Sequence, residues 1–304
     1  MSFAEKLKSG KFLVTSEVGP PKGVNIDKSL EEAEILKGKA DAFNVTDLQS
    51  SVMKLGSLVV CHLLVERGLE PVFQLTCRDR NRLALQSDLL SAYVLGIRNV
   101  LVLTGDHPIL GDHPGARPVF DLDSVSLLEV ASGLMEGKDM KGNELDGKVE
   151  FCLGAVVNPG ADPLEPQLIK MEKKIEVGAK FFQTQAVYDL KTFEKFMKKV
   201  EKFKVPILGG IVLLKSAGMA RYMNKNVAGV SVPEKYIKMM AEAKKEERAK
   251  VSIQIGAELI KGMKEICQGV HIMPLGWERH VPKLLEASGL SGRRSTQTNK
   301  INIS

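Results

Sequence analysis

The feature that most constrains this fold is a regular alternation of short apolar segments with helix-forming segments. Eight segments rich in β-branched and aliphatic residues end at polar or glycine residues, which is typical of buried parallel strands. These strand candidates are residues 11–18, 42–47, 70–76, 100–103, 151–157, 181–185, 205–212 and 269–273. A helix candidate follows each of them: 28–36, 53–67, 81–96, a segment from 124, 165–177, 190–202, two segments from 216 and over 233–263, and 281–288. Eight such repeats predict an α/β fold, a single (β/α)8 TIM barrel.

The domain organisation follows from the same pattern. No linker rich in Pro, Ser or Gly divides the 304 residues, so we expect one barrel domain over 1–290. The long stretch before the last strand predicts a helical insertion between strands seven and eight. Residues 291–304 form a polar C-terminal tail that we expect to be mobile. A doubly wound sheet is disfavoured, because no Gly-x-Gly-x-x-Gly follows the first strand.

Composition excludes several classes of protein. The chain is 44% hydrophobic and 26% charged, which is typical of a soluble globular protein. Its start lacks the apolar core of a signal peptide, and no window approaches the ~18 apolar residues of a membrane span, so we predict a cytoplasmic protein. The net charge of +6 arises from lysine mixed with glutamate, and aromatic residues make up only 5%, so a nucleic-acid surface is not expected.

The four cysteines predict neither disulfides nor a metal site. Cys61, Cys77, Cys152 and Cys267 are widely spaced, with no Cys-x-x-Cys pair and no histidine at ligand spacing. We expect them to be reduced thiols in the core.

Polar residues gather at the ends of the strand candidates. The clearest case is Val100-Leu-Val-Leu-Thr-Gly-Asp106, where an apolar strand leads into a glycine and a carboxylate. Gly105-Asp106 alone could be an ordinary turn, but the pattern recurs. A barrel would bring together at one mouth Glu17, Asn44, Thr46, Asp47, Gln74, Thr76, Asp106, Asn158, Gln183 and Gln185. This set holds no nucleophile paired with a base, and it suits a large heteroaromatic ligand better than hydrolysis. The proline-rich segment 106–121 is predicted to be an active-site loop.

Four of these motifs, in this order, resemble the methylenetetrahydrofolate reductase family in its short bacterial form. They are Ser16-Glu-Val-Gly-Pro-Pro21, Gln74-Leu-Thr-Cys-Arg78, Leu103-Thr-Gly-Asp106 and Glu176-Val-Gly-Ala-Lys-Phe-Phe-Gln-Thr-Gln185. The resemblance implies a flavin-dependent barrel oxidoreductase of one-carbon metabolism, which reduces 5,10-methylenetetrahydrofolate to 5-methyltetrahydrofolate.

The resemblance also implies roles for individual residues. Glu17 corresponds to the general acid, and Asp106 to a catalytic aspartate beside the flavin and the pterin. Gln74 and Gln185 are expected to bind the folate substrate together with Asp106. The expected flavin-binding residues are Thr46, Thr76, Thr104, Gly105, Asp106, Ala155, Asn158 and Lys174.

Three departures from the family pattern leave alternatives open. Thr104 stands where relatives often have arginine, and Gln167 stands where an acid can hold the adenosine ribose, so the flavin is FAD or FMN. The segment 213–219 lacks a glutamine expected at the nicotinamide site, so the electron donor is NAD(P)H or a partner redox protein. The chain could accordingly be a catalytic or assembly subunit of a larger complex or oligomer. A proline-dehydrogenase-like enzyme and a pterin methyltransferase are further alternatives on the same fold.

Overall fold

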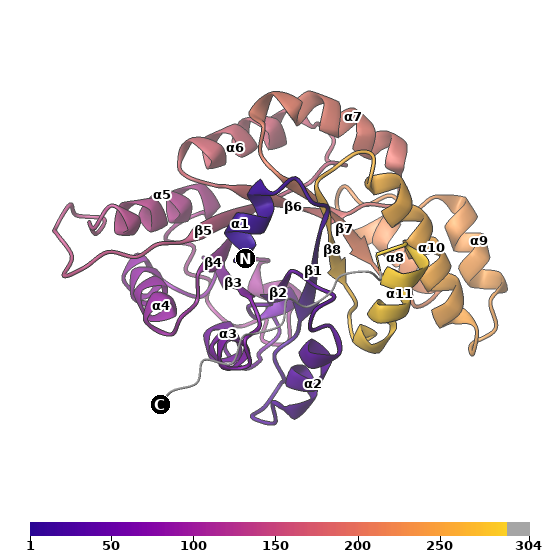
Figure 1. Ribbon diagram of the computed structural model, residues 1–304, viewed down its shortest axis with the longest axis horizontal. Helices are drawn as coiled ribbons and strands as arrows, with labels where there is room; N and C mark the ends of the chain where they lie inside the picture. Colours follow the sequence, from indigo (N-terminus) through magenta and orange to yellow (C-terminus); the bar gives the residue numbers. More distant parts are fainter. Residues whose placement is uncertain (291–304) are drawn as a thin grey trace.

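The computed structural model describes residues 1–290, which form a closed barrel of parallel strands (Figure 1). The strands follow one another around the ring in sequence order, and the last pairs with the first. They are β1 (Leu13–Val18), β2 (Ala42–Val45), β3 (Pro71–Thr76), β4 (Asn99–Leu103), β5 (Cys152–Val157), β6 (Phe181–Ala186), β7 (Ile207–Val212) and β8 (Gly269–Met273). The predicted (β/α)8 barrel is therefore confirmed. The predicted mobile tail, 291–304, lies outside the described residues.

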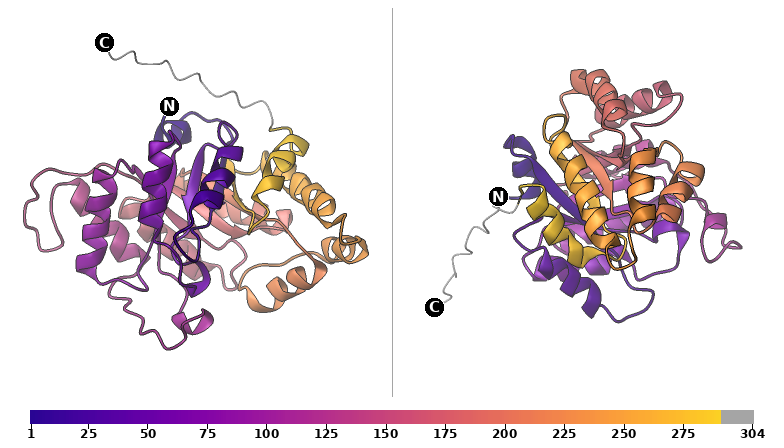
Figure 2. Two further views of the ribbon diagram at one scale, coloured as in Figure 1. Left: turned by 90° about the horizontal axis from the view of Figure 1, so that it is seen from below. Right: turned by 90° about the vertical axis from the view of Figure 1, so that its right-hand side faces the viewer.

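Helices surround the barrel and connect its strands (Figure 2). They are α1 (Phe3–Lys8), α2 (Asp27–Ile35), α3 (Ser57–Glu66), α4 (Arg82–Val94), α5 (Ser124–Met135), α6 (Glu165–Glu176), α7 (Leu190–Val200), α8 (Ala217–Asn226), α9 (Glu234–Glu242), α10 (Arg248–Met263) and α11 (Val281–Ala287). Short 3-10 turns are η1 (Gln49–Ser51), η2 (Pro108–Leu110), η3 (Glu201–Phe203) and η4 (Glu278–His280). Three helices, α8 to α10, lie between β7 and β8.

The structure differs from the sequence prediction at three helices. The predicted helical segment 233–263 is divided into α9 and α10, because the backbone at Ala243 has an extended conformation. The helix predicted from residue 53 begins only at Ser57, since Gly56 before it is also extended. The short helix α1 was not predicted, although Ser2 and Glu5 form a capping box at its start.

Alternating side chains of each strand divide the core in two. Outward residues such as Val14 and Val18 pack against the helices in the main hydrophobic core. Inward residues at the amino ends of the strands form a separate apolar cluster made of Leu13, Ala42, Val72, Leu101, Cys152, Phe181 and Leu208, closed by Phe3. In Figure 1, α1 lies over the middle of the ring of strands. Its Phe3 meets Phe181 edge to face at 5.2 Å, so one end of the barrel is plugged.

All four cysteines are buried and free, as the sequence predicts. Burial raises the pKa of Cys77 and Cys152 to about 12 and that of Cys267 to about 11. These thiols are inert core residues at neutral pH.

Candidate active site at the barrel mouth

The opposite end of the barrel opens into a cavity of about 450 Å³. This volume lies in the ~300–1,000 Å³ range typical of ligand pockets. Its lining comes from the carboxyl ends of β1, β3, β4, β5, β6 and β8, from the loop after β2, and from α6. In the left view of Figure 2, the loop after β4 lies at the end of the barrel away from α1 and the N-terminus.

Most of the predicted site residues meet in this cavity. Those that line it are Glu17, Gln74, Thr76, Thr104, Gly105, Asp106, Asn158, Lys174 and Gln185. Thr46 and Ala155, which were also predicted to bind the flavin, do not line this cavity. Side chains alternate in direction along β5, and that of Val156 lines the cavity. The side chain of Ala155 therefore points the other way and packs in the core that faces the helices. Thr46 is 1% exposed and lies beyond the last residue of β2. We therefore leave both out of the proposed site.

Glu17 is held at the wall of the cavity by groups from distant parts of the chain. It is 9% exposed. Gln49 Nε2 donates to its Oε2 at 3.3 Å, and His271 Nε2 lies 3.7 Å from its Oε1. The carboxyl group is thus contacted on both oxygens.

A buried polar network supports this glutamate from below. His271 Nδ1 lies 2.9 Å from Thr15 Oγ1, which also accepts a hydrogen bond from Gln183 Nε2 at 3.1 Å. Gln183 and Asn44 exchange two amide hydrogen bonds of 2.8 and 2.9 Å. The network spans β1, β2, β6 and β8, so these strand ends are fixed relative to one another.

Asp47 is a structural support for the floor of the site. It is 3% exposed and accepts hydrogen bonds from the Thr76 amide and hydroxyl at 3.0 and 2.8 Å. Arg80 contributes two more donors at 2.8 and 3.2 Å. The charged pair therefore fixes the orientation of Thr76 at the end of β3.

The loops after β2 and β4 are bound together over the mouth. Arg78, 2% exposed, donates to the carbonyls of Leu48 and Asp106 at 3.3 and 3.4 Å. Ser51 Oγ donates to the Asp106 carbonyl at 2.9 Å. Leu48, Ser50 and Ser51 have positive φ angles of 44°, 56° and 58°. Such backbone is strained in residues other than glycine and is common at functional sites.

Gly105 is required by this packing. Its φ is +92°, and a Cβ there would lie 3.1 Å from Arg78 Cβ and 3.3 Å from Thr76 Cβ. A side chain would push apart the elements that form the floor of the site.

Lys174 is a buried cation aimed at the cavity from α6. It is 5% exposed, and its ammonium group donates to the Val156 carbonyl at 2.8 Å. That carbonyl is its one hydrogen-bond acceptor among residues 1–290, although an ammonium group has three donors. Burial, with a smaller effect from Lys170, lowers the pKa of Lys174 to about 8.

Several polar groups of the cavity remain available for a ligand. The side-chain amide of Gln74 and the carboxylate of Asp106 line the cavity and make no side-chain hydrogen bond within the described part of the chain. Asn158, in contrast, is used structurally, since it donates to the Ala228 carbonyl at 2.8 Å and accepts from the Gly160 amide. Gln185 Oε1 accepts from the Ala186 amide at 3.0 Å.

Sequence reasoning missed several residues of this site, among them His271, Arg78, Gln49 and Lys170. His271 could have been found, because alternation along β8 places it inward between Gly269 and Met273. Arg78 lies in a loop and Gln49 in the short 3-10 turn η1, and no periodic pattern shows the direction of a side chain there.

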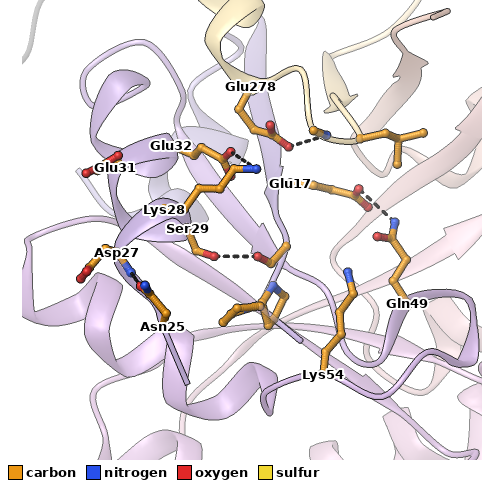
Figure 3. A pocket seen from close by; sticks show the side chains of 15 residues that line it. Glu17, Asn25, Asp27, Lys28, Ser29, Glu31, Glu32, Gln49, Lys54 and Glu278 are labelled. Atoms are coloured by element: carbon orange, nitrogen blue, oxygen red, sulfur yellow. Dashed lines mark hydrogen bonds and ion pairs between the residues drawn. The ribbon is translucent and has the colours of Figure 1, made fainter. Parts of the chain in front are cut away.

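A second cavity of about 790 Å³ adjoins the first, between the loops after β1 and β8 (Figure 3). Glu17 and Gln49 line both. On its far side Glu32 of α2 faces Glu278, and burial together with the neighbouring Glu278 raises the pKa of Glu32. Glu17 therefore stands in the partition between two cavities.

A plugged barrel with a polar mouth at the carboxyl ends of its strands is the architecture of a (β/α)8 enzyme. A family profile described as methylenetetrahydrofolate reductase matches residues 2–289. The chain belongs to the methylenetetrahydrofolate reductase family.

Individual relatives agree with this assignment. Methylenetetrahydrofolate reductase 2 of Schizosaccharomyces pombe is 29% identical over 323 residues, which is 96% of this chain and 48% of the relative. The 5,10-methylenetetrahydrofolate reductase of Pectobacterium carotovorum is 27% identical over 62% of this chain and 58% of the relative. The chain thus spans about half the length of these relatives.

A solved structure supports the fold. A Clostridium thermocellum protein described as binding two copies of 5-methyl-5,6,7,8-tetrahydrofolic acid superposes with a TM-score of 0.61 at 16% identity, covering 94% of this chain and 96% of that one. Within residues 1–290, no helix combines the length and the apolar character needed to cross a membrane. The cytoplasmic location stays a prediction.

Proposed function

We propose that this chain is a flavin-dependent oxidoreductase that reduces 5,10-methylenetetrahydrofolate to 5-methyltetrahydrofolate. Family membership supports the reaction class. The folate bound by the Clostridium thermocellum protein, which has a similar fold, supports a folate ligand for this chain.

The donor set of the mouth fits a flavin. Lys174 and Lys170 line one side of the cavity and offer cationic donors to a phosphate group. Thr76, Thr104 and the backbone at Gly105 line the neighbouring wall and can hold the isoalloxazine ring. A bound reduced flavin supplies the hydride for the reaction. The proposal covers both FAD and FMN. Gln167 lines the cavity at the position where an acid in the family can bind the adenosine ribose of FAD, a group that FMN lacks.

The chain's own residues then act on the folate. Asp106, Gln74 and Gln185 would bind the pterin through their remaining donors and acceptors and so orient its one-carbon unit for reduction. Glu17 donates a proton to N10 of the folate as the bond between this nitrogen and the methylene carbon breaks. Gln49 keeps the Glu17 carboxyl turned toward the cavity.

The observation that carries this proposal is the buried Glu17 carboxyl in the cavity wall, across the mouth from Asp106 and Lys174. Purified protein should bind flavin. After photoreduction without oxygen, the flavin should be reoxidised by methylenetetrahydrofolate with formation of methyltetrahydrofolate. A chain that cannot be reconstituted with FAD or FMN would contradict the proposal.

The same assay excludes the two competing activities. Proline should leave the oxidised flavin unreduced, and methyltetrahydrofolate should transfer no methyl group to a thiol or corrinoid. Mass spectrometry of the extracted flavin decides between FAD and FMN.

The electron donor is a separate proposal. Because the segment 213–219 lacks the glutamine expected at a nicotinamide site, we propose that electrons reach this chain from a partner redox protein, so that the chain is the catalytic subunit of a complex. Stopped-flow mixing of the flavin-loaded chain with NADH or NADPH tests this. Rapid bleaching by the isolated chain would remove the need for a partner.

A further inference from the structure

The mechanism above assigns no role to His271, a buried titratable side chain beside Glu17. His271 is 4% exposed on β8 and lines the mouth cavity. Its two ring nitrogens face different partners, Thr15 on one side and Glu17 on the other.

The hydrogen bonds around Thr15 favour one tautomer of this ring, the one that accepts at Nδ1. Thr15 Oγ1 accepts a hydrogen bond from Gln183 Nε2, and the Gln183 amide is itself oriented by its double exchange with Asn44. The single hydroxyl proton of Thr15 is then available for His271 Nδ1, 2.9 Å away. A neutral imidazole that accepts at Nδ1 carries its proton on Nε2.

The protonated nitrogen is the one that faces Glu17. Nε2 lies 3.7 Å from Glu17 Oε1, which is longer than a hydrogen bond. Contacts of this kind often shorten when a substrate binds. The other carboxyl oxygen, Oε2, accepts from Gln49.

We propose that His271 is a positioning residue for Glu17. Its Nε2–H, directed by Thr15, Gln183 and Asn44, occupies Oε1 and leaves the Oε2 edge beside Gln49 to carry the transferable proton. The effect on folate reduction rests on the proposed function, whereas the coupling between His271 and Glu17 does not.

Two variants separate the two contacts of the ring. His271→Asn keeps a polar atom near Nδ1, so it retains the Thr15 contact but does not reach Glu17. His271→Gln places an amide N–H near the Nε2 position. We expect the Asn variant to lose folate turnover by ~10-fold, mainly in kcat, and the Gln variant to stay within ~3-fold of the wild type.

A double-mutant cycle distinguishes positioning from a general structural effect. In a Glu17→Gln background, His271→Asn should lower the residual turnover by less than ~3-fold, because the contact that it removes no longer serves an acid. An undiminished ~10-fold loss in that background would overturn the proposal. His62→Gln on α3, a half-buried histidine that lines neither cavity, is the matched control.

A measurement without turnover tests the coupling directly. In long-range ¹H–¹⁵N spectra of histidine-labelled protein near pH 7, the His271 signal is the one absent from His271→Gln. It should show the neutral Nε2–H tautomer, and Glu17→Gln should shift it while leaving His62 unchanged. An Nδ1–H tautomer, or a His271 signal indifferent to Glu17→Gln, would overturn the proposal. If the wild type lacks folate turnover while these signals behave as expected, the proposed function fails and the coupling stands.

Discussion

The two ends of the barrel are built from the same eight strands but differ completely in character. At the amino ends, Leu13, Val72 and Phe181 point inward and pack around Phe3. One or two inward positions further along the same strands stand Glu17, Gln74 and Gln183. The change from apolar to polar takes place within a single strand, over a few residues.

This difference separates stability from chemistry. The plugged end buries mainly apolar surface, and its buried Asn99 is hydrogen-bonded to Glu70 and to the Pro71 carbonyl, so this end stabilises the closed ring. The mouth buries a lysine, a glutamate and several amides, which cost desolvation unless they are paired or meet a ligand. Substitutions at the plug should therefore change the free energy of unfolding, and those at the mouth should change binding or turnover.

The largest expected effect is at the plug. Phe3→Ala leaves a cavity beside Phe181 and removes the edge-to-face contact, so we expect a loss of ~3–5 kcal/mol in the free energy of unfolding. Denaturant titration measures this, with Leu83→Ala, an exposed site on α4, as the control. A loss below ~1 kcal/mol would show that α1 is dispensable for the barrel.

Glu17→Gln tests the mouth. Glutamine retains the shape of the side chain but cannot donate the proton to N10, so folate turnover should fall by at least ~10²-fold. Flavin content and the free energy of unfolding should change little. If the variant turned over folate at the wild-type rate, another acid such as Asp106 or a bound water would have to replace Glu17.

Lys174→Met should raise the free energy of unfolding and lower the affinity for the flavin. The pKa of Lys174 is lowered in the folded chain from 10.5 to about 8. Burying its charge thus costs stability below pH 8, and this cost disappears as the pH rises toward 10.5. At pH 7 the flavin-free variant should be more stable than the wild type by ~1–3 kcal/mol.

The same lysine predicts a pH dependence of flavin binding. A phosphate group needs the charged ammonium, so wild-type affinity for the flavin should fall as the pH rises through about 8. In Lys174→Met the affinity should be weaker and nearly flat over that range. Lys173→Met, an exposed neighbour on α6, should behave as the wild type; isothermal titration at several pH values decides.

The smallest expected effect is that of Asp106→Asn. This exposed carboxylate should disfavour the negative charge of a reduced flavin, so the variant should have a higher flavin potential. Folate affinity should weaken by ~10-fold, because one charged acceptor for the pterin becomes neutral. Redox titration and folate binding measure the two changes; an unchanged potential would place Asp106 away from the flavin.

Local pattern sufficed to predict most of the mouth. Glu17, Gln74 and Thr76 lie near the carboxyl ends of apolar strands and Asp106 follows one, and parallel strands of a barrel end on the same side. Ala155 was predicted from the resemblance rather than from the strand pattern. Its side chain does not line the cavity, because side chains alternate along β5 and the positions of Gly154 and Val156 take the inward direction.

The sequence alone thus determined the barrel fold, its eight strand–helix repeats and the polar character of one end. These features depend on periodicity and on residue type within short windows of sequence. Only the tertiary structure decided which groups act together. Thr15 and His271 are 256 residues apart in the chain and meet because β1 pairs with β8. The Arg78 contacts with Leu48 and Asp106, and the placement of Glu17 between two cavities, arise in the same way. Ring closure brings these loops and strand ends together, and no local pattern specifies contacts between segments so far apart in the chain.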